Sequence, residues 1–197
     1  PTGADQSKGC IYLGLLNDYT GPFGPYGIPL ETGQRGFWLW ANQSGGIGDY
    51  SVAIVEGYDT QYNPQKHLEG YKAQRGEVAA LAMSLGTPQT QFILDDMDAD
   101  NMIAAPMSWY SGWSYKGSDR GLVVEFGSSY CADGMNALDW AMANLPVDIK
   151  TVGVMGYAGD YGGDYAAGVK AAAEANGSTV AWEYLVPRPE SDAAQAR

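Results

Sequence analysis

Short apolar runs alternate along this chain with longer segments of helical character, and Gly- and Pro-rich stretches separate them. The runs that we expect to be strands are 11–16, 50–55, 78–83, 102–105, 123–126, 151–155 and 179–186. The segments that we expect to be helices are 30–42, 64–75, 88–98, 132–145 and 165–176. Strands that alternate with helices pair in parallel through right-handed crossovers. The pattern therefore predicts an α/β fold, with a parallel sheet and helices on both of its faces.

Helix ends carry the clearest local signals. Asn63 stands before Pro64, which predicts an N-cap followed by proline at the first helical position. The stretch 44–46, Ser-Gly-Gly, is expected to end the helix at 30–42, and the Gly/Pro cluster before Leu30 is expected to be a loop. Loops that follow the carboxyl ends of parallel strands line the region where such folds bind ligands, so these loops are the place to look for function.

Composition excludes several classes of partner. Eleven Lys and Arg residues against 23 Asp and Glu give a net charge of -12, the wrong sign for a nucleic acid or an anionic membrane surface. No apolar run is long enough to cross a bilayer. The first nine residues lack the basic and apolar regions of a signal peptide, so either this is the mature form, with its signal peptide removed, or the protein never carried one.

Two cysteines, Cys10 and Cys131, allow at most one disulfide, and whether they pair stays open at this point. No Cys-x-x-Cys pair or Cys/His cluster has the spacing of a metal site. The sequence therefore predicts neither a metal nor any other cofactor.

Four motifs occur in the order and spacing of a known family. The first is LGLLNDYTGPFGPYG at 13–27, where a strand leads into Thr-Gly-Pro and then Tyr-Gly. The second is NQSGGI at 42–47, the third is DTQYNP at 59–64, and the fourth is DYG at 160–162. Together they resemble the type I periplasmic solute-binding proteins of ABC importers, specifically the branched-chain amino acid and amide group, also described as extracellular ligand-binding receptors.

The resemblance implies a domain organisation. Members of this family have two lobes and a longer chain, so the sequence corresponds to their N-terminal half. Residues 1–127 would form most of lobe 1, residues 128–197 would begin lobe 2, and the first crossover would lie at 127–132. Residues 192–197 look like the start of another helix. We therefore expect the chain to be a truncated or proteolysed piece of a longer protein.

The resemblance also implies a function. Proteins of this family capture a small solute between their lobes, close by a hinge motion and dock on an ABC permease in the membrane. The expected protein is a monomer in the periplasm or outside the cell that takes an amino acid, an amide or a carboxylate, including aromatic ones, and breaks no bond. The alternative is a ligand-sensing domain of a receptor or regulator with the same fold.

Site residues are expected on the loops after the strands. They are Tyr19 and Tyr26 after the first strand; Ser84, Leu85 and Thr87 after the third; Met107, Ser108 and Trp109 after the fourth; and Tyr161 in lobe 2. For three of these positions a purely structural role is also open. Tyr26 could pack its own loop, Thr87 could cap the helix at 88–98, and Trp109 could pack with Tyr110 against neighbouring loops.

Other chemistry finds little support in the sequence. His67, the only histidine, falls in the polar segment 64–75 and is expected on the surface, which leaves a hydrolase or transferase without a nucleophile and base pair. The aspartates of 95–101 lack the central Gly and closing Glu of an EF-hand, which favours an acidic helix end. The Gly-rich stretch 156–163 matches no phosphate-binding motif.

Overall fold

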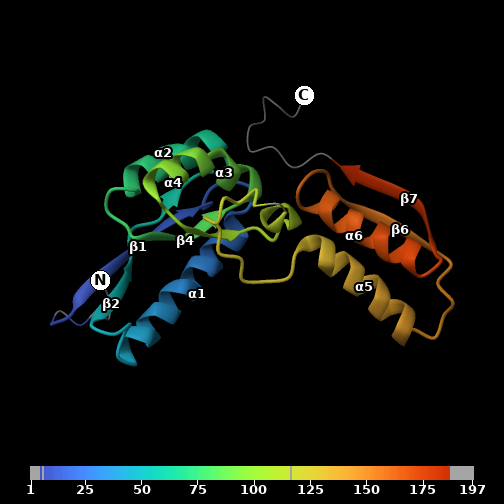
Figure 1. Ribbon diagram of the computed structural model, residues 1–197, viewed down its shortest axis with the longest axis horizontal. Coiled ribbons are helices and arrows are strands. Elements are labelled where there is room, and N and C mark those ends of the chain that lie inside the picture. Colours follow the sequence, from blue (N-terminus) through green and yellow to red (C-terminus); the bar gives the residue numbers. More distant parts are fainter. Residues whose placement is uncertain (1–4, 6, 116, 187–197) are drawn as a thin grey trace. The chain divides into compact units, whose positions relative to one another are not determined.

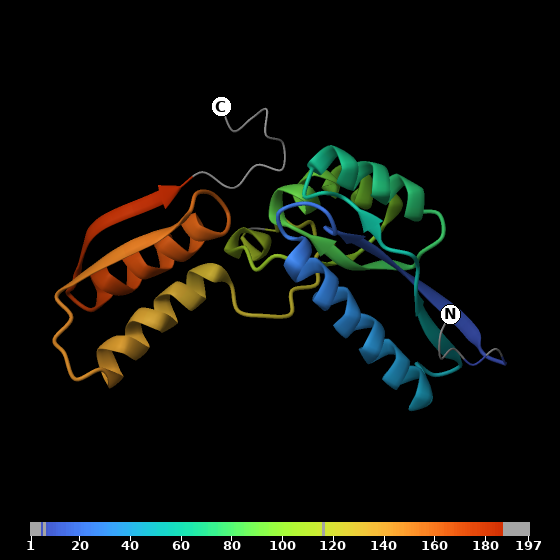
Figure 2. The same ribbon diagram turned by 180° about the vertical axis from the view of Figure 1, so that it is seen from behind.

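The computed structural model describes residues 5, 7–115 and 117–186 of the 197-residue chain. These residues form two compact units (Figures 1 and 2). Among the described residues, the first unit contains the chain up to Met107 together with Arg120–Val124. The second unit contains Ser108–Asp119 and the chain from Glu125 onward. The helix expected to begin near residue 192 lies outside the described residues.

A parallel sheet forms the centre of the first unit. Its strands are β1 (Gly9–Asn17), β2 (Tyr50–Ile54), β3 (Tyr58–Asp59), β4 (Ala80–Leu85) and β5 (Ala104–Met107). Their order is β2-β1-β4-β5, and β3 pairs with the end of β1. Every one of these pairings is parallel, as the alternation of strands and helices predicts.

Helices cover both faces of this sheet, as predicted. They are α1 (Gly24–Gln43), α2 (Pro64–Gln74), α3 (Thr87–Phe92) and α4 (Leu94–Asp100). Both ribbon views show α1 on one side of the sheet and the other three helices on the opposite side (Figures 1 and 2). The α/β class is confirmed.

The core of the first unit includes side chains of its two central strands, β1 and β4. Leu15 and Leu16 of β1 and Met83 of β4 are completely buried. Their register shifts between Gly14 and Leu15, where the β1–β4 ladder is irregular. The buried amide of Gln74 compensates for this irregularity, because its Oε1 accepts the Leu15 N–H at 2.9 Å and its Nε2 donates to the Leu15 carbonyl at 3.3 Å.

Helix α1 begins at Gly24, six residues before the predicted start at Leu30. Two features explain why the Gly/Pro cluster is helical rather than a loop. Pro25 stands in the first turn of α1, where backbone N–H groups have no partner within the helix, so the proline costs no hydrogen bond. Gly27 is buried against the loop that follows β1, and a Cβ on Gly27 would overlap the Asp18 carbonyl oxygen. The glycine serves close packing of the helix onto this loop.

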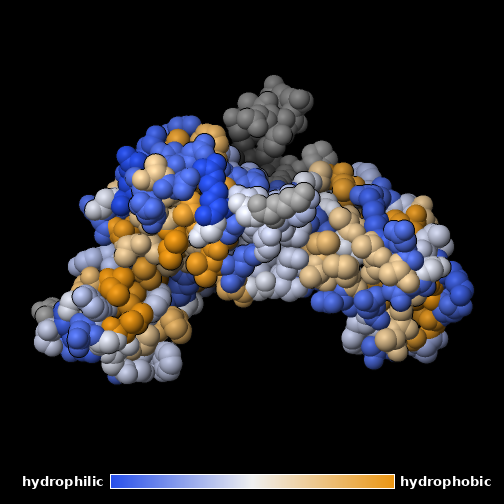
Figure 3. All heavy atoms as spheres, in the orientation of Figure 1, coloured by the Kyte–Doolittle hydropathy of each residue, from blue (hydrophilic) through white to orange (hydrophobic). Residues whose placement is uncertain are grey.

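The outward side of α1 carries apolar residues. Ile28, Phe37 and Trp40 are each more than half exposed. In Figure 3, residues of high hydropathy extend over the surface that α1 and the neighbouring strands form.

Two further elements differ from the prediction. The single helix expected at 88–98 is two helices, α3 and α4, interrupted at Ile93. The strand expected at 123–126 is wrong, because only Val123 makes an isolated bridge, to Ala104. By contrast, Asn63 is the N-cap of α2 as predicted, and its side chain accepts the N–H groups of Gln65 and Lys66.

The acidic stretch at 95–101 lies in α4 and just beyond it, in agreement with an acidic helix end. Its aspartates are paired with arginines of the same unit. Arg120 contacts Asp95 and Asp98, and Arg75 contacts Asp100 at 3.1 Å. These carboxylates therefore attach the returning segment Arg120–Val124 and helix α2 to α4.

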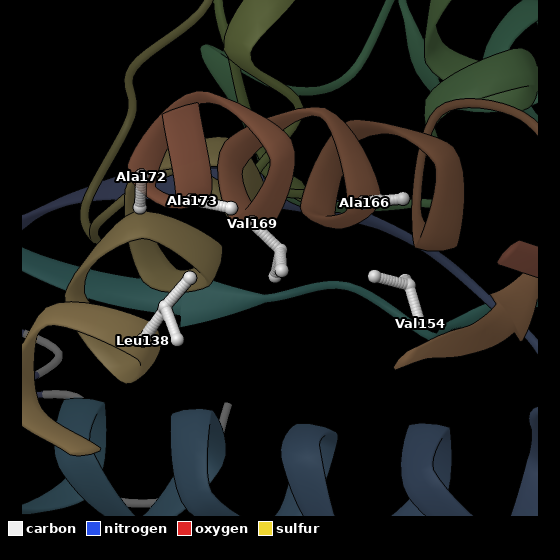
Figure 4. Close-up of a cluster of buried hydrophobic side chains, with 6 residues drawn as sticks. All are labelled: Leu138, Val154, Ala166, Val169, Ala172 and Ala173. Carbon is white, nitrogen blue, oxygen red and sulfur yellow. The ribbon is translucent and has the colours of Figure 1, made fainter. Parts of the chain in front are cut away.

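The second unit is a two-stranded parallel sheet with two helices. Its elements are the short helix η1 (Ser111–Ser114), α5 (Tyr130–Asn144), β6 (Thr151–Tyr157), α6 (Gly162–Ala175) and β7 (Thr179–Val186). Leu138 of α5, Val154 of β6 and four residues of α6 form its core and point toward one another in Figure 4. The other face of the sheet presents Met155, Trp182 and Tyr184, all more than half exposed.

Helices α5 and α6 approach each other through glycines. A Cβ on Gly168 of α6 would overlap the carbonyl oxygen of Cys131, and a Cβ on Gly134 of α5 would overlap the carbonyl oxygen of Tyr165. Backbone atoms of one helix thus occupy the space that a side chain on the other would need. Both cysteines of the chain, Cys10 on β1 and Cys131 on α5, are free thiols.

The chain passes between the two units more than once. It leaves the first unit after Met107, returns at Arg120 and leaves again after Val124. The returning segment lies beside β5. Ala104 of β5 donates its N–H to the Leu122 carbonyl and accepts the N–H of Val124. The division into the two units thus involves several crossings of the chain. The lobes predicted at 1–127 and 128–197 stay a prediction.

Candidate functional site

The carboxyl ends of β1, β4 and β5 meet at one edge of the first unit's sheet. The register places Ser84 of β4 next to Leu16 of β1, and Leu85 of β4 next to Met107 of β5. The structure therefore brings together three of the predicted site residues, Ser84, Leu85 and Met107, as the parallel topology requires.

The loop after β1 is organised by two carboxylates. Asp18, completely buried, accepts the N–H groups of Gly21 at 2.6 Å and Phe23 at 2.7 Å. Asp59 accepts the N–H of Tyr19 at 2.9 Å and the Thr20 hydroxyl at 2.6 Å. Burial alone would raise the pKa of Asp59. The hydrogen bonds that its carboxylate accepts have the larger combined effect, so the pKa of Asp59 lies below its ordinary value. The loop is thus held in one conformation by its own acids.

The two tyrosines predicted for this loop differ in their surroundings. Tyr19 is half-buried and its hydroxyl donates to Glu31 at 2.5 Å. Burial, followed by the hydrogen bond to the Glu31 carboxylate, raises the pKa of Tyr19. Tyr26 is 65% exposed in the first turn of α1, with its ring 6.4 Å from that of Phe23. Tyr26 is therefore the more accessible of the two, and both roles as ligand contacts stay predictions.

Ser84 is completely buried and its hydroxyl is shared between two neighbours. It lies 2.8 Å from His67 Nε2 and 2.7 Å from Thr90 Oγ1. Thr90 donates to the Gly86 carbonyl at 2.9 Å, so Ser84 donates to Thr90 and accepts from a His67 protonated at Nε2. His67 connects α2 through Ser84 to the start of α3.

The prediction that His67 lies on the surface is wrong, because its side chain is completely buried. His67, Gly70, Tyr71 and Gln74 are all buried and recur at helical spacing, so they form the inner face of α2. This face is mostly polar and therefore gives no hydrophobic signal in the sequence. Desolvation lowers the pKa of His67 to about 3, and its Nδ1 has no hydrogen-bond partner among the described residues.

Thr87 and Leu85 are also buried. Thr87 is not the helix cap that one interpretation expected, because Gly86, with a φ of 100°, stands at the N-cap of α3 without a side-chain hydrogen bond. The left-handed backbone there favours glycine. Since α3 has only six residues, its end offers little helix dipole for an anion.

Four aromatic rings of the second unit form a row, which we call the aromatic row: Phe126, Trp109, Tyr130 and Tyr161. It joins two predicted site residues, Trp109 and Tyr161, through a residue that the sequence did not single out, Tyr130. The third predicted residue of this unit, Ser108, is buried and accepts the indole N–H of Trp113 at 3.1 Å. Both interpretations of Trp109 therefore remain, since it packs on its neighbours Phe126 and Tyr130 within a row whose end rings are accessible.

Asp164 attaches the segment Ser108–Asp119 to the rest of the second unit. Its carboxylate accepts the N–H and the hydroxyl of Ser111 at 2.9 and 2.5 Å, and the N–H of Cys131 at 3.3 Å. Burial and the nearby Asp164 charge raise the pKa of the Cys131 thiol. One carboxylate at the start of α6 thus positions both η1 and the start of α5.

Replacing Asp164 by Asn is expected to loosen this attachment. The asparagine amide keeps one acceptor oxygen but places its NH₂ group against the N–H and O–H donors of Ser111 and Cys131. We therefore expect the free energy of unfolding to fall by about 2 kcal/mol. Hydrogen exchange should show faster amide exchange at Ser111 and Cys131. Glu174→Gln, at an exposed position of α6, is the matched control. Equal exchange at Ser111 in the wild-type protein and Asp164→Asn would contradict the attachment.

Sequence reasoning did not foresee the roles of four polar residues inside loops and helices: Asp18, Asp59, His67 and Asp164. The motif 59–64 marked the position of Asp59 without indicating its contacts. No group of three or more His, Cys, Asp and Glu side chains could hold a metal ion in the part of the chain that the structure describes. None of the described helices is long and apolar enough to cross a membrane.

The chain belongs to the periplasmic binding protein family, whose model matches residues 10–196. This confirms the resemblance that the loop motifs carry. Membership of this family implies an extracytoplasmic location. No match was found among curated proteins.

Three of the solved structures that share this fold come from ABC transporters. A fatty acid ABC transporter substrate-binding protein from Thermomonospora curvata has a TM-score of 0.79 and 26% identity, covering 100% of this chain and 50% of its own. A branched-chain amino acid ABC transporter protein from Thermus thermophilus with bound valine has a TM-score of 0.77 and 14% identity, covering 96% and 49%. A solute-binding protein from Rhodopseudomonas palustris HaA2 in complex with p-hydroxybenzoic acid has a TM-score of 0.76 and 17% identity, covering 90% and 47%. The chain spans about half the length of these structures.

Proposed function

We propose that this chain is part of the extracytoplasmic solute-binding subunit of an ABC importer and that it captures a small solute for a membrane permease. The family match over residues 10–196 is the observation that carries the proposal. The subunit works in the periplasm or outside the cell and captures its solute without breaking a bond.

The arrangement of the loops supports capture. In the first unit, β1, β4 and β5 end at one sheet edge, and internal hydrogen bonds hold the segments that follow β1 and β4. In the second unit, the aromatic row lies where α5 and α6 begin. Loops fixed in advance bind a small solute with little loss of conformational entropy. Exposed side chains such as Tyr26 and Tyr161 are the contacts that we propose first.

A ligand screen on the protein at its native length tests this function. The panel contains valine, 4-hydroxybenzoate, octanoate and acetamide, which represent the amino acid, aromatic carboxylate, fatty acid and amide classes. A solute that binds only the folded state stabilises it by about 2.7 kcal/mol at 100 times its Kd. We expect a rise in melting temperature with concentration for one class.

Calorimetry on the solute that raises the melting temperature should give one site per molecule. The protein must first be unfolded and refolded to remove any bound solute that was carried through purification. A flat response from all four classes after this treatment would contradict the proposed function.

A further inference from the structure

The aromatic row has a regular geometry. Phe126 and Trp109 have ring centroids 5.3 Å apart at 71°, Trp109 and Tyr130 are 6.1 Å apart at 73°, and Tyr130 and Tyr161 are 4.8 Å apart at 69°. Each ring therefore meets the next edge to face. The two end rings remain open, since Phe126 is 52% and Tyr161 46% exposed. Such a row can be extended by one more ring.

The inner rings of the row are fixed by the backbone. The Trp109 carbonyl accepts the Tyr130 N–H at 2.7 Å, and the indole lies directly on Gly127, where a Cβ would overlap it. Tyr130 is the first residue of α5 and Tyr161 stands at the N-cap of α6. These anchors hold the rings in place before any solute arrives, so binding does not have to order them.

The described residues of the second unit offer the row no unpaired cationic side chain. The first three N–H groups of α5 are already bonded, to the Trp109 carbonyl, the Asp164 carboxylate and the Ser129 hydroxyl. Among the described residues of the second unit, the cations are Lys150 and Lys170, which are paired with Asp148 and Glu183. What the row itself presents to a solute is therefore aromatic surface and not a charged side chain.

We propose that the solute carries a planar aromatic ring, which Tyr161 and Tyr130 bind edge to face as a continuation of the aromatic row. This inference rests on the proposed function and narrows it to one class of solute. An edge-to-face pair contributes about 0.5 to 1.5 kcal/mol beyond the buried area, which an aliphatic ring of equal size does not gain. The protein accordingly prefers an aromatic acid to its saturated counterpart.

The experiment compares benzoate with cyclohexanecarboxylate, which share the carboxylate and nearly the same size. Titration calorimetry on the protein at its native length should give an affinity about 3- to 10-fold higher for benzoate. Tyr161→Leu should reduce this ratio to about 1, and Tyr161→Phe should retain it. Trp140→Leu, an exposed position of α5 outside the row, is the matched control and should leave the ratio unchanged.

The outcomes separate this inference from the function on which it rests. Equal affinity for the two acids, or tight binding of valine or octanoate alone, would overturn the aromatic preference and leave solute capture intact. A benzoate preference that persists in a folded Tyr161→Leu would remove the row from the site and overturn the inference. Binding of none of these solutes would contradict the proposed function itself. The ratio in the unaltered protein decides the preference even where Tyr161→Leu fails to fold.

Discussion

Replacing Gly168 by Val is expected to destabilise the second unit by about 3 kcal/mol. The new side chain would overlap the carbonyl oxygen of Cys131, a backbone atom that can move only if α5 itself moves. Separating α5 from α6 would also open the core around Leu138 and Val169. Urea unfolding monitored by circular dichroism should show the loss, and hydrogen exchange should place it in these two helices.

Gly163→Ala is the matched control for this prediction, because Gly163 lies in the same helix and no neighbouring atom comes within 4 Å of the position that the methyl group would take. There the gain in helix propensity, at most about 1 kcal/mol, should leave stability equal or slightly higher. A Gly168→Val protein as stable as Gly163→Ala would show that the helices do not approach each other at this glycine.

Acid is expected to unfold the first unit partly through His67. Its pKa is about 3 in the folded protein and about 6.5 in an unfolded chain, because burial disfavours the charged imidazolium. Above pH 6.5 the imidazole is neutral in both states and the full stability is present. Between pH 6.5 and 3 the unfolded state binds the extra proton, so stability falls by about 1.4 kcal/mol per pH unit and by about 5 kcal/mol in all.

Since His67 is the only histidine, one variant isolates its contribution. His67→Gln is expected to be less stable at pH 7 but to lose less stability between pH 6.5 and 4.5, because carboxylates titrate in both proteins and cancel in the comparison. Nitrogen NMR of the wild-type imidazole should show the Nε2–H tautomer that the Ser84 contact requires, with no titration near pH 6.5. Parallel pH profiles for the two proteins would refute the buried, neutral histidine.

The alternation of strands and helices was predictable because it depends on apolar runs and on signals within a few residues. Asn63 followed by Pro64 predicted the start of α2, and the motif at 13–27 predicted the loop where Asp18 and Tyr19 lie. The family followed from such loops as well, because their glycines and prolines are dictated by backbone geometry.

The rest depended on contacts between distant segments. The early start of α1 is determined by the fit of Gly27 against Asp18, and the burial of His67 by a polar helix face that carries no hydrophobic periodicity. Tyr130 and Phe126 join the candidate site only because the chain folds back beside Trp109. Such pairings follow from the tertiary structure, and the side chains involved have no distinguishing pattern in the sequence.

The repeated passage of the chain between its two units bears on how such proteins diversify by genetic recombination. A single junction near residue 128 would inherit Ser111 from one parent and Asp164 from the other, although these residues are bonded in one unit. A viable chimaera would have to exchange Ser108–Asp119 together with the chain from Glu125 onward. Specificity in this lineage is therefore expected to change by substitution within loops more readily than by exchange of whole lobes.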